Sequence, residues 1–151
     1  MTEFSADSRL ARIIGTMQWR VRPERLMLVG IDPREQPVAL RLVSGFTGRF
    51  WQITVEPEVV TLALEESDWR AVSPAFPRAR VERPYRAISF EVDLPPDLVG
   101  FMAVLSGALA SAGVPLLAVS GFTRDHLLVR EADLERAEAC IAELVARAGR
   151  G

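Results

Sequence analysis

The chain has 151 residues, of which 49% are hydrophobic, and a formal net charge of −2 at pH 7. A chain of this length can bury about 70% of its unfolded surface, so it should form a globular core without covalent or metal staples. The acidic balance argues against a nucleic-acid partner, which favours a strongly basic face. One cysteine and one histidine exclude an internal disulfide and a Cys/His zinc cluster, so we expect no metal and no cofactor.

The N-terminal half is predicted to be mostly β. The first sixteen residues have only weak helical spacing and predict a loose start. Aromatic and β-branched residues then indicate strands, and Pro23 lies where a ladder amide is not needed. The pattern predicts two pairs of strands around turns, with a short helix over 38–43 between the pairs; the strands cover 17–22, 25–31, 49–55 and 59–65.

The segment 66–85 marks a predicted domain boundary, because prolines and arginines cluster there without a periodic apolar pattern. We expect an N-terminal module over 17–72, a connector over 73–83 and a C-terminal module over 84–148. The basic side chains of this region indicate a solvated connector rather than a phosphate site, since the patch is short and the chain is acidic. They are Arg78, Arg80, Arg83 and Arg86.

The C-terminal half has the clearer pattern. Residues 86–93 alternate between apolar and polar positions, as in a strand with one buried face. A helix face follows from Leu98 to Leu109, and Gly113 should end that helix as a left-handed cap. Two strands around the turn near 122 and an amphipathic helix from Leu134 complete the order β-α-β-β-α. This order favours an α+β fold, with an antiparallel sheet and helices on one face.

One segment, DLVGFMAVLSGALASAGVPLLAVSGFTRDHLLVREADLERA, resembles the second module of bacterial tandem-ACT proteins. It is also similar to the ACT modules of the eukaryotic cytosolic arginine sensor. WRVRPERLMLVGID and RFWQITVEPEVVTLALEE, followed by Trp69, resemble the family's N-terminal module. The resemblance implies two tandem ACT-like modules of the ferredoxin-like βαββαβ type and a small-molecule ligand, which we expect to be an amino acid. The matching positions are Gly100, AGVPLLAVS, Phe122, Asp125, His126, Leu128 and Val129.

In ACT-type sites the ligand lies between the loop entering the first helix of one module and the hairpin turn of another. Gly100 would let a ligand carboxylate approach the free amides of a helix start, and Asp125 would accept a hydrogen bond from a ligand ammonium. Two structural alternatives stay open: Gly100 permits close helix–sheet packing, and Asp125 caps the hairpin turn. The family turn usually reads Ser-Thr-Phe, whereas this chain has glycine in the middle position. The expected ligand-binding residues are Val99, Gly100, Ser120, Gly121, Phe122, Thr123 and Asp125.

The remaining candidates have ordinary structural explanations. Asp93 and Asp97 are expected to cap the following helix, His126 to pack or lie on the surface, and Cys140 to be partly buried and inert. No phosphate loop, nucleophile elbow or metal motif occurs in the sequence, so we expect no enzyme activity. The function indicated is a non-catalytic sensor of the ACT type that binds a small molecule. The alternative is a ligand-free module for protein–protein interaction or oligomerisation.

Two further expectations concern location and assembly. The polar start of the chain lacks the pattern of a signal peptide, and glycines and Pro115 interrupt the apolar stretch 98–119, so we expect a cytoplasmic protein with no membrane partner. The C-terminal module lacks the last strand of βαββαβ, which would leave an open sheet edge. Residues 17–22 or a strand from a second chain should fill that edge, and we expect a homodimer.

Overall fold

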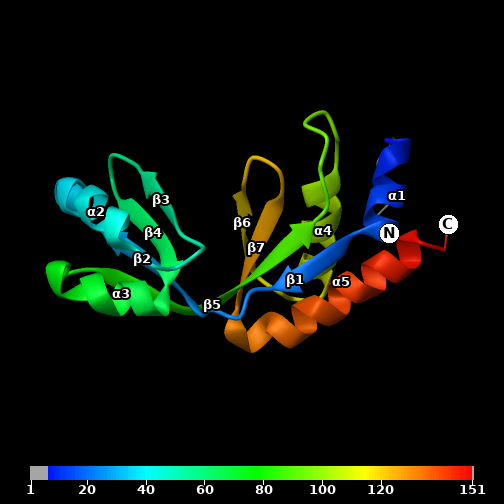
Figure 1. Ribbon diagram of the computed structural model, residues 1–151. Helices are drawn as coiled ribbons and strands as arrows, with labels where there is room; N and C mark the ends of the chain where they lie inside the picture. The colour runs from blue at the N-terminus through cyan, green and yellow to red at the C-terminus, as the bar shows by residue number, and fades with distance from the viewer. Residues whose placement is uncertain (1–6, 151) are drawn as a thin grey trace. The chain divides into compact units, whose positions relative to one another are not determined.

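The computed structural model describes residues 7–150 and divides them into two units (Figure 1). The N-terminal unit comprises residues 23–85, and the C-terminal unit comprises residues 7–22 together with 86–150. This division differs from the predicted modules 17–72 and 84–148. The predicted connector 73–83 holds a short 3₁₀ helix, η3 (Ser73–Ala75), and the beginning of strand β5 (Arg80–Glu91), whose residues are shared between the two units.

The N-terminal unit is a βαββαβ module. Its strands are hydrogen-bonded in the order β3-β4-β2-β5, and each neighbouring pair is antiparallel. Helix α3 was not predicted from the sequence, because prolines and arginines dominate the residues that follow it. Its Trp69 is buried and stacks on Phe76, with ring centroids 6.3 Å apart. The elements of the unit, besides β5, are β2 (Leu26–Ile31), α2 (Gln36–Leu42), β3 (Gln52–Val55), β4 (Val60–Glu65) and α3 (Glu66–Val72), with short 3₁₀ turns η1 (Pro33–Glu35) and η2 (Val43–Gly45) on either side of α2.

The C-terminal unit completes its sheet with a strand from the beginning of the chain. The strand order is β1-β5-β7-β6, and β1 pairs antiparallel with β5, placing Trp19 opposite Phe90 and Val21 opposite Ile88. This confirms that residues 17–22 fill the edge. Within residues 7–150, β1 pairs with β5 and β2 pairs with β4 and β5, so the predicted first hairpin is wrong. The further elements are β1 (Gln18–Val21), α4 (Phe101–Ser111), β6 (Leu116–Ser120), β7 (Asp125–Arg130), η4 (Glu131–Asp133) and α5 (Leu134–Ala148).

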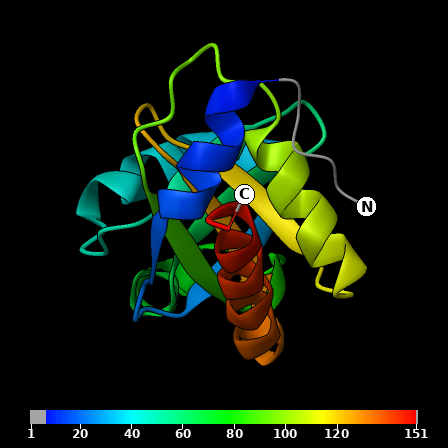
Figure 2. The ribbon, with the colours of Figure 1, turned by 90° about the vertical axis from the view of Figure 1, so that its right-hand side faces the viewer.

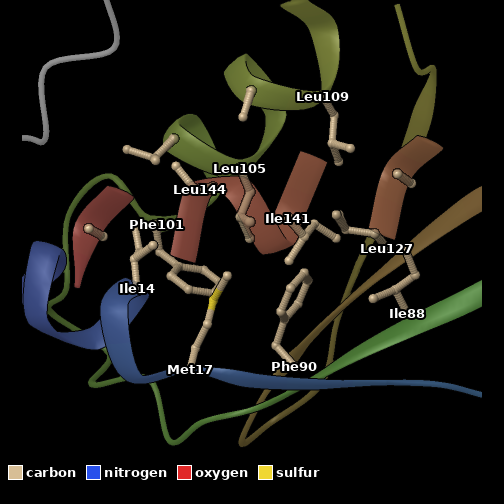
Figure 3. Packing of buried hydrophobic residues seen from close by; sticks show 14 of the residues in the cluster. Ile14, Met17, Ile88, Phe90, Phe101, Leu105, Leu109, Leu127, Ile141 and Leu144 are labelled. Carbon is tan, nitrogen blue, oxygen red and sulfur yellow. The ribbon is translucent and has the colours of Figure 1, made fainter. Parts of the chain in front are cut away.

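Three helices pack together in the C-terminal unit and cover one face of its strands (Figure 2). Figure 3 shows Phe90, Leu105 and Ile141 pointing toward one another in the core between strands and helices. Phe90 also meets the ring of Phe101 edge to face, with centroids 5.7 Å apart. The predicted α+β class, with antiparallel ferredoxin-like modules, is confirmed. None of the helices in residues 7–150 is long and apolar enough to cross a membrane.

Helix α1 (Ser8–Thr16) replaces the loose start that was expected over its residues, and residues 1–6 of that predicted start lie outside the described residues. The Asp7 carboxylate accepts a hydrogen bond from the Arg9 amide at 3.0 Å and so caps the helix. This bond satisfies one of the amides that have no partner within the first turn of a helix. Leu10 and Ile14 are fully buried in the C-terminal core. The apolar residues near the start of the sequence therefore lie on one face of a short amphipathic helix, and the helix is too short for their spacing to give a strong signal.

Helices α1 and α5 approach closely at Gly15. A Cβ at this position would lie 2.9 Å from the backbone nitrogen of Gly149 and 3.1 Å from the carbonyl carbon of Ala148. We expect Gly15→Ala to lower the free energy of unfolding by about 1–3 kcal/mol, because backbone must move to admit the methyl group. Gly45→Ala is the matched control, since nothing lies within 4 Å of its Cβ. Equal urea-unfolding curves for the two variants would contradict this expectation.

Candidate functional site

A groove of about 510 Å³ lies in the C-terminal unit, where the loop between β5 and α4 meets the turn between β6 and β7. Val99, which was also expected in the site, is absent from the lining, and 64% of its surface is exposed to solvent. The chain thus brings two separate loops together much as the sequence indicated. The predicted residues that line the groove are Gly100, Ser120, Gly121, Phe122, Thr123 and Asp125.

Gly100 is the N-cap of α4 and has φ 98° and ψ −4°, in the left-handed region. Glycine adopts this conformation without the steric cost that a Cβ brings, so the backbone alone explains its presence. Lacking a side chain, Gly100 makes no capping hydrogen bond to the amides of the first helical turn. Exposed amides at a helix start favour an anion, and this feature, rather than the glycine itself, indicates a carboxylate site.

The loop that enters α4 is held by residues of α1 and its cap. Arg9 donates to both carboxylate oxygens of Asp97, at 3.3 and 3.1 Å, and the Val99 amide donates to Asp7. Hydrogen bonds from Arg9 hold the pKa of Asp7 well below its usual range. Asp97 therefore fixes the loop by an ion pair instead of capping α4, and this corrects the expectation from the sequence.

Asp125 begins β7 and lies directly opposite Ser120 in the hairpin. Its side chain is half-buried, and among residues 7–150 its carboxylate has neither a hydrogen-bond nor an ion-pair partner, although it acts electrostatically on His126. The turn is closed instead by a backbone bond, in which the Gly121 amide donates to the Arg124 carbonyl at 2.9 Å. The alternative that Asp125 serves as a cap of the turn is therefore not what the structure shows.

The hairpin turn also explains the glycine at position 121. A Cβ there would lie 3.1 Å from the carbonyl oxygen of Arg124, which is tighter than most such contacts. Glycine thus lets the two strands close at this point, whereas a threonine here would require a shift of the turn. At the tip of the turn, the Phe122 side chain is fully exposed, with a relative accessibility of 106%. It forms the rim of the groove rather than an enclosed apolar wall.

Several lining residues were missed from the sequence. Arg124 is half-buried and stands between two predicted site residues, so its place in the same turn was a usable signal. The others come from the proline-containing loop and the first turn of α4, where no charged or periodic pattern marks them. They are Leu94, Pro95, Pro96, Leu98, Phe101, Met102 and Ala103.

His126 and Cys140 have packing roles, as expected. His126 is buried, and its Nδ1 lies 2.8 Å from the Ser89 hydroxyl, which also accepts a hydrogen bond from Arg22 at 3.1 Å. Cys140 is half-buried on α5, and burial raises the pKa of its thiol, which disfavours the reactive thiolate. Among the described residues no group of histidine, cysteine, aspartate and glutamate side chains could hold a metal ion.

The environment of His126 predicts a pH dependence of stability. Burial lowers its pKa, the charges of Arg22 and Arg124 lower it further, and Asp125 opposes them. Unfolded histidine titrates near pH 6.5, so below that pH the unfolded chain binds a proton that the folded protein holds less strongly. Stability that is fully present above about pH 6.5 should therefore fall as the pH drops toward the folded pKa, by at most about 1.4 kcal/mol per pH unit.

Urea unfolding from pH 8 to pH 5 measures this effect, with His126→Gln as the comparison. The difference in stability between parent and variant should shrink as the pH falls through this range, because the variant has no imidazole to protonate. Carboxylates that titrate at lower pH contribute to both proteins and cancel in the difference. A constant difference from pH 8 to pH 5 would show that burial does not perturb this histidine.

Two buried carboxylates in the N-terminal unit were also missed, and they have a structural role. Asp68 accepts the amides of Thr47 and Gly48 at 2.9 and 2.8 Å, and Glu65 accepts the amides of Arg49 and Phe50 at 2.8 and 3.3 Å. These bonds satisfy the backbone of the loop between α2 and β3. All the hydrogen bonds described for these carboxylates hold this loop, so we assign no ligand to them.

Comparison with known proteins agrees with the α+β fold of two ferredoxin-like modules. Residues 80–143 match the family model of the ACT domain, and this stretch contains the whole groove. The search of curated proteins finds no relative. The likeness to the arginine sensor stays a prediction, because these comparisons do not bear on it.

Three solved structures illustrate the shared fold. A protein of unknown function from Vibrio cholerae, described as a possible transport protein, has 18% identity and a TM-score of 0.69, covering 90% of this chain and 95% of that chain. A protein from Agrobacterium tumefaciens has 21% identity and a TM-score of 0.69, covering 85% and 89%. The regulatory subunit of aspartate kinase from Thermus flavus has 12% identity and a TM-score of 0.64, covering 83% and 95%. At these identities the likeness establishes the fold alone.

Proposed function

We propose that this chain is a non-catalytic regulatory protein that binds a free α-amino acid in the groove of the C-terminal unit. The observation that carries the proposal is the juxtaposition of two complementary groups around one hollow. The first turn of α4 at Gly100 has no side-chain cap and offers amides to an α-carboxylate. The Asp125 carboxylate has no hydrogen bond or ion pair among residues 7–150 and offers an acceptor to an α-ammonium. The ACT-domain match over residues 80–143 supports this assignment.

The proposed output is a change of conformation or assembly. The fold is shared with a protein described as the regulatory subunit of aspartate kinase, which supports a regulatory role. We propose a homodimer in which a second copy covers the exposed rim at Phe122. If the ligand binds one assembly state more tightly, linkage requires that assembly and ligand affinity change each other reciprocally.

A thermal-shift panel of the twenty amino acids tests the proposal. A ligand at about 100 times its dissociation constant stabilises the folded state by about 2.7 kcal/mol, which corresponds to a rise of several degrees in the melting temperature. We expect one amino acid, or a few related ones, to produce such a rise. A panel in which none does so would count against an amino-acid ligand.

The second candidate function is a ligand-free interaction module, and one observation favours it. Phe122 and Val99, with 106% and 64% relative accessibility, place two apolar side chains in solvent around the groove, as interaction surfaces often do. A flat thermal-shift panel, together with a dimer in light scattering whose mass is unaffected by amino acids, would favour this candidate over the sensor.

A further inference from the structure

A second groove, of about 620 Å³, lies in the N-terminal unit. It is formed by the end of β2 and the following turn, by Glu58 between β3 and β4, and by the segment that leads into β5. The arginines that line it are Arg34, Arg78 and Arg80, and the carboxylates are Asp32, Glu35 and Glu58. Formal charges in the groove therefore balance, and its binding properties depend on which of these groups are already paired.

Two of the carboxylates are committed within the turn. Arg34 donates two hydrogen bonds to the Asp32 carboxylate, from Nε at 2.9 Å and from Nη2 at 2.7 Å, in the bidentate geometry that arginine favours. Glu35 accepts the Asp32 amide at 3.2 Å and completes a capping box. The charge of Arg78 adds to the influence of Arg34 in holding the pKa of Asp32 below its usual range.

Arg78 and Arg80 are not committed in this way. Among the side chains that the structure describes, neither has a carboxylate within ion-pair distance, and Arg78 acts on Asp32 only through its charge. Arg80 lies opposite Gly30 in the β2–β5 pair, and its Nη2 is 3.6 Å from the place where a Cβ on Gly30 would lie. The Arg80 guanidinium therefore lies beside the strand at Gly30, where both residues line the groove.

We infer that this groove is a second ligand site, in which Arg78 and Arg80 bind the phosphate or carboxylate group of a small molecule. Two guanidinium groups to which the described residues give no acceptor match an anionic group with several oxygens. Of the three carboxylates that line the groove, Glu58 alone has neither a hydrogen bond nor an ion pair among residues 7–150. The site is separate from the groove of the C-terminal unit and does not depend on the function proposed for it. The arginine cluster that the sequence presented as a solvated connector thus acquires a role at Arg78 and Arg80. Arg86 instead pairs with Glu131 at 3.6 Å, and the side chain of Arg83 lies outside the described residues.

Titration of the ¹⁵N-labelled full chain with inorganic phosphate, and separately with acetate, tests the inference at constant ionic strength set with chloride. The amide signals of Gly30, Ile31 and Arg80 should move and saturate. Saturation with phosphate alone would indicate a phosphate-bearing ligand, and saturation with both anions a site that also accepts carboxylates. The double variant Arg78→Gln/Arg80→Gln should weaken binding by at least about tenfold, as expected for the loss of charge-assisted hydrogen bonds.

Arg41→Gln is the matched control, because Arg41 is an exposed arginine of the same unit outside the groove. It removes one positive charge and should leave the titration unchanged. Shifts that rise linearly with both anions, or saturation that is equal in the parent and the double variant, would overturn the inference. Either result would leave the amino-acid proposal untouched, since the thermal-shift panel tests that proposal through the other groove.

Discussion

Replacing Gly100 by glutamate should abolish ligand binding to the C-terminal groove. The new carboxylate would lie at the uncapped first turn of α4, where we place the carboxylate of the ligand, and would repel it. The substitution also carries a folding cost. Because Gly100 has φ 98°, any side chain there should lower stability by about 1–2 kcal/mol. Calorimetric titration with the best amino acid from the thermal-shift panel measures the loss.

Gly100→Ala separates the two effects, because alanine bears the same backbone strain without the negative charge. We expect the alanine variant to melt earlier than the parent but still to bind the ligand, and the glutamate variant to melt earlier and not to bind. If the glutamate variant binds as tightly as the parent, the ligand carboxylate is not held at this helix start. If both variants lose binding equally, the strained backbone rather than the charge controls the site.

Local patterns predicted most of the elements but not all of their partners. The apolar spacing from Leu98 to Leu109 corresponds to α4, and Gly113 has the left-handed φ of 68° that its position after the helix suggested. Strands β1 and β2 were also found, yet alternation reveals that a segment is extended, not which strand it joins. A different argument, namely that βαββαβ needs a last strand, predicted that either β1 or a strand from a second chain would fill the edge, and β1 fills it by pairing with β5.

The misses have identifiable physical causes. Helix α3 has acidic residues in its first turn and a buried Trp69, but it is only seven residues long and is followed at once by prolines, so its period could not be read. The part of the groove formed by the β6–β7 turn was predictable, because Gly121, Phe122 and Asp125 are residue types that indicate a binding turn. The lining residues from Leu94 to Pro96 were not predictable, because loop residues acquire a common surface only when the chain folds. The prediction of Val99 as a site residue failed for a related reason. Its position next to Gly100 in the sequence does not determine the direction of its side chain, which is exposed to solvent.

The final prediction concerns Asp125, whose carboxylate distinguishes a ligand site from an ordinary hairpin. Asp125→Asn keeps the size and shape of the side chain but removes its charge. A charge-assisted hydrogen bond to a ligand ammonium contributes roughly 1.5–3 kcal/mol, so affinity for the amino acid should fall by about one to two orders of magnitude. Stability without ligand should change by less than about 0.5 kcal/mol, because the carboxylate has neither a hydrogen bond nor an ion pair within residues 7–150.

Asp93→Asn is the matched control, since Asp93 is an exposed carboxylate of the same unit that does not line the groove. It removes the same charge from the protein as a whole, so any long-range electrostatic attraction of the ligand weakens similarly in both variants. Calorimetric titration of the parent and the two variants should show a large loss of affinity for Asp125→Asn alone. Equal affinities in all three proteins would mean that the Asp125 carboxylate lines the groove but does not bind the ligand. The group that binds the ammonium would then be another residue of the groove.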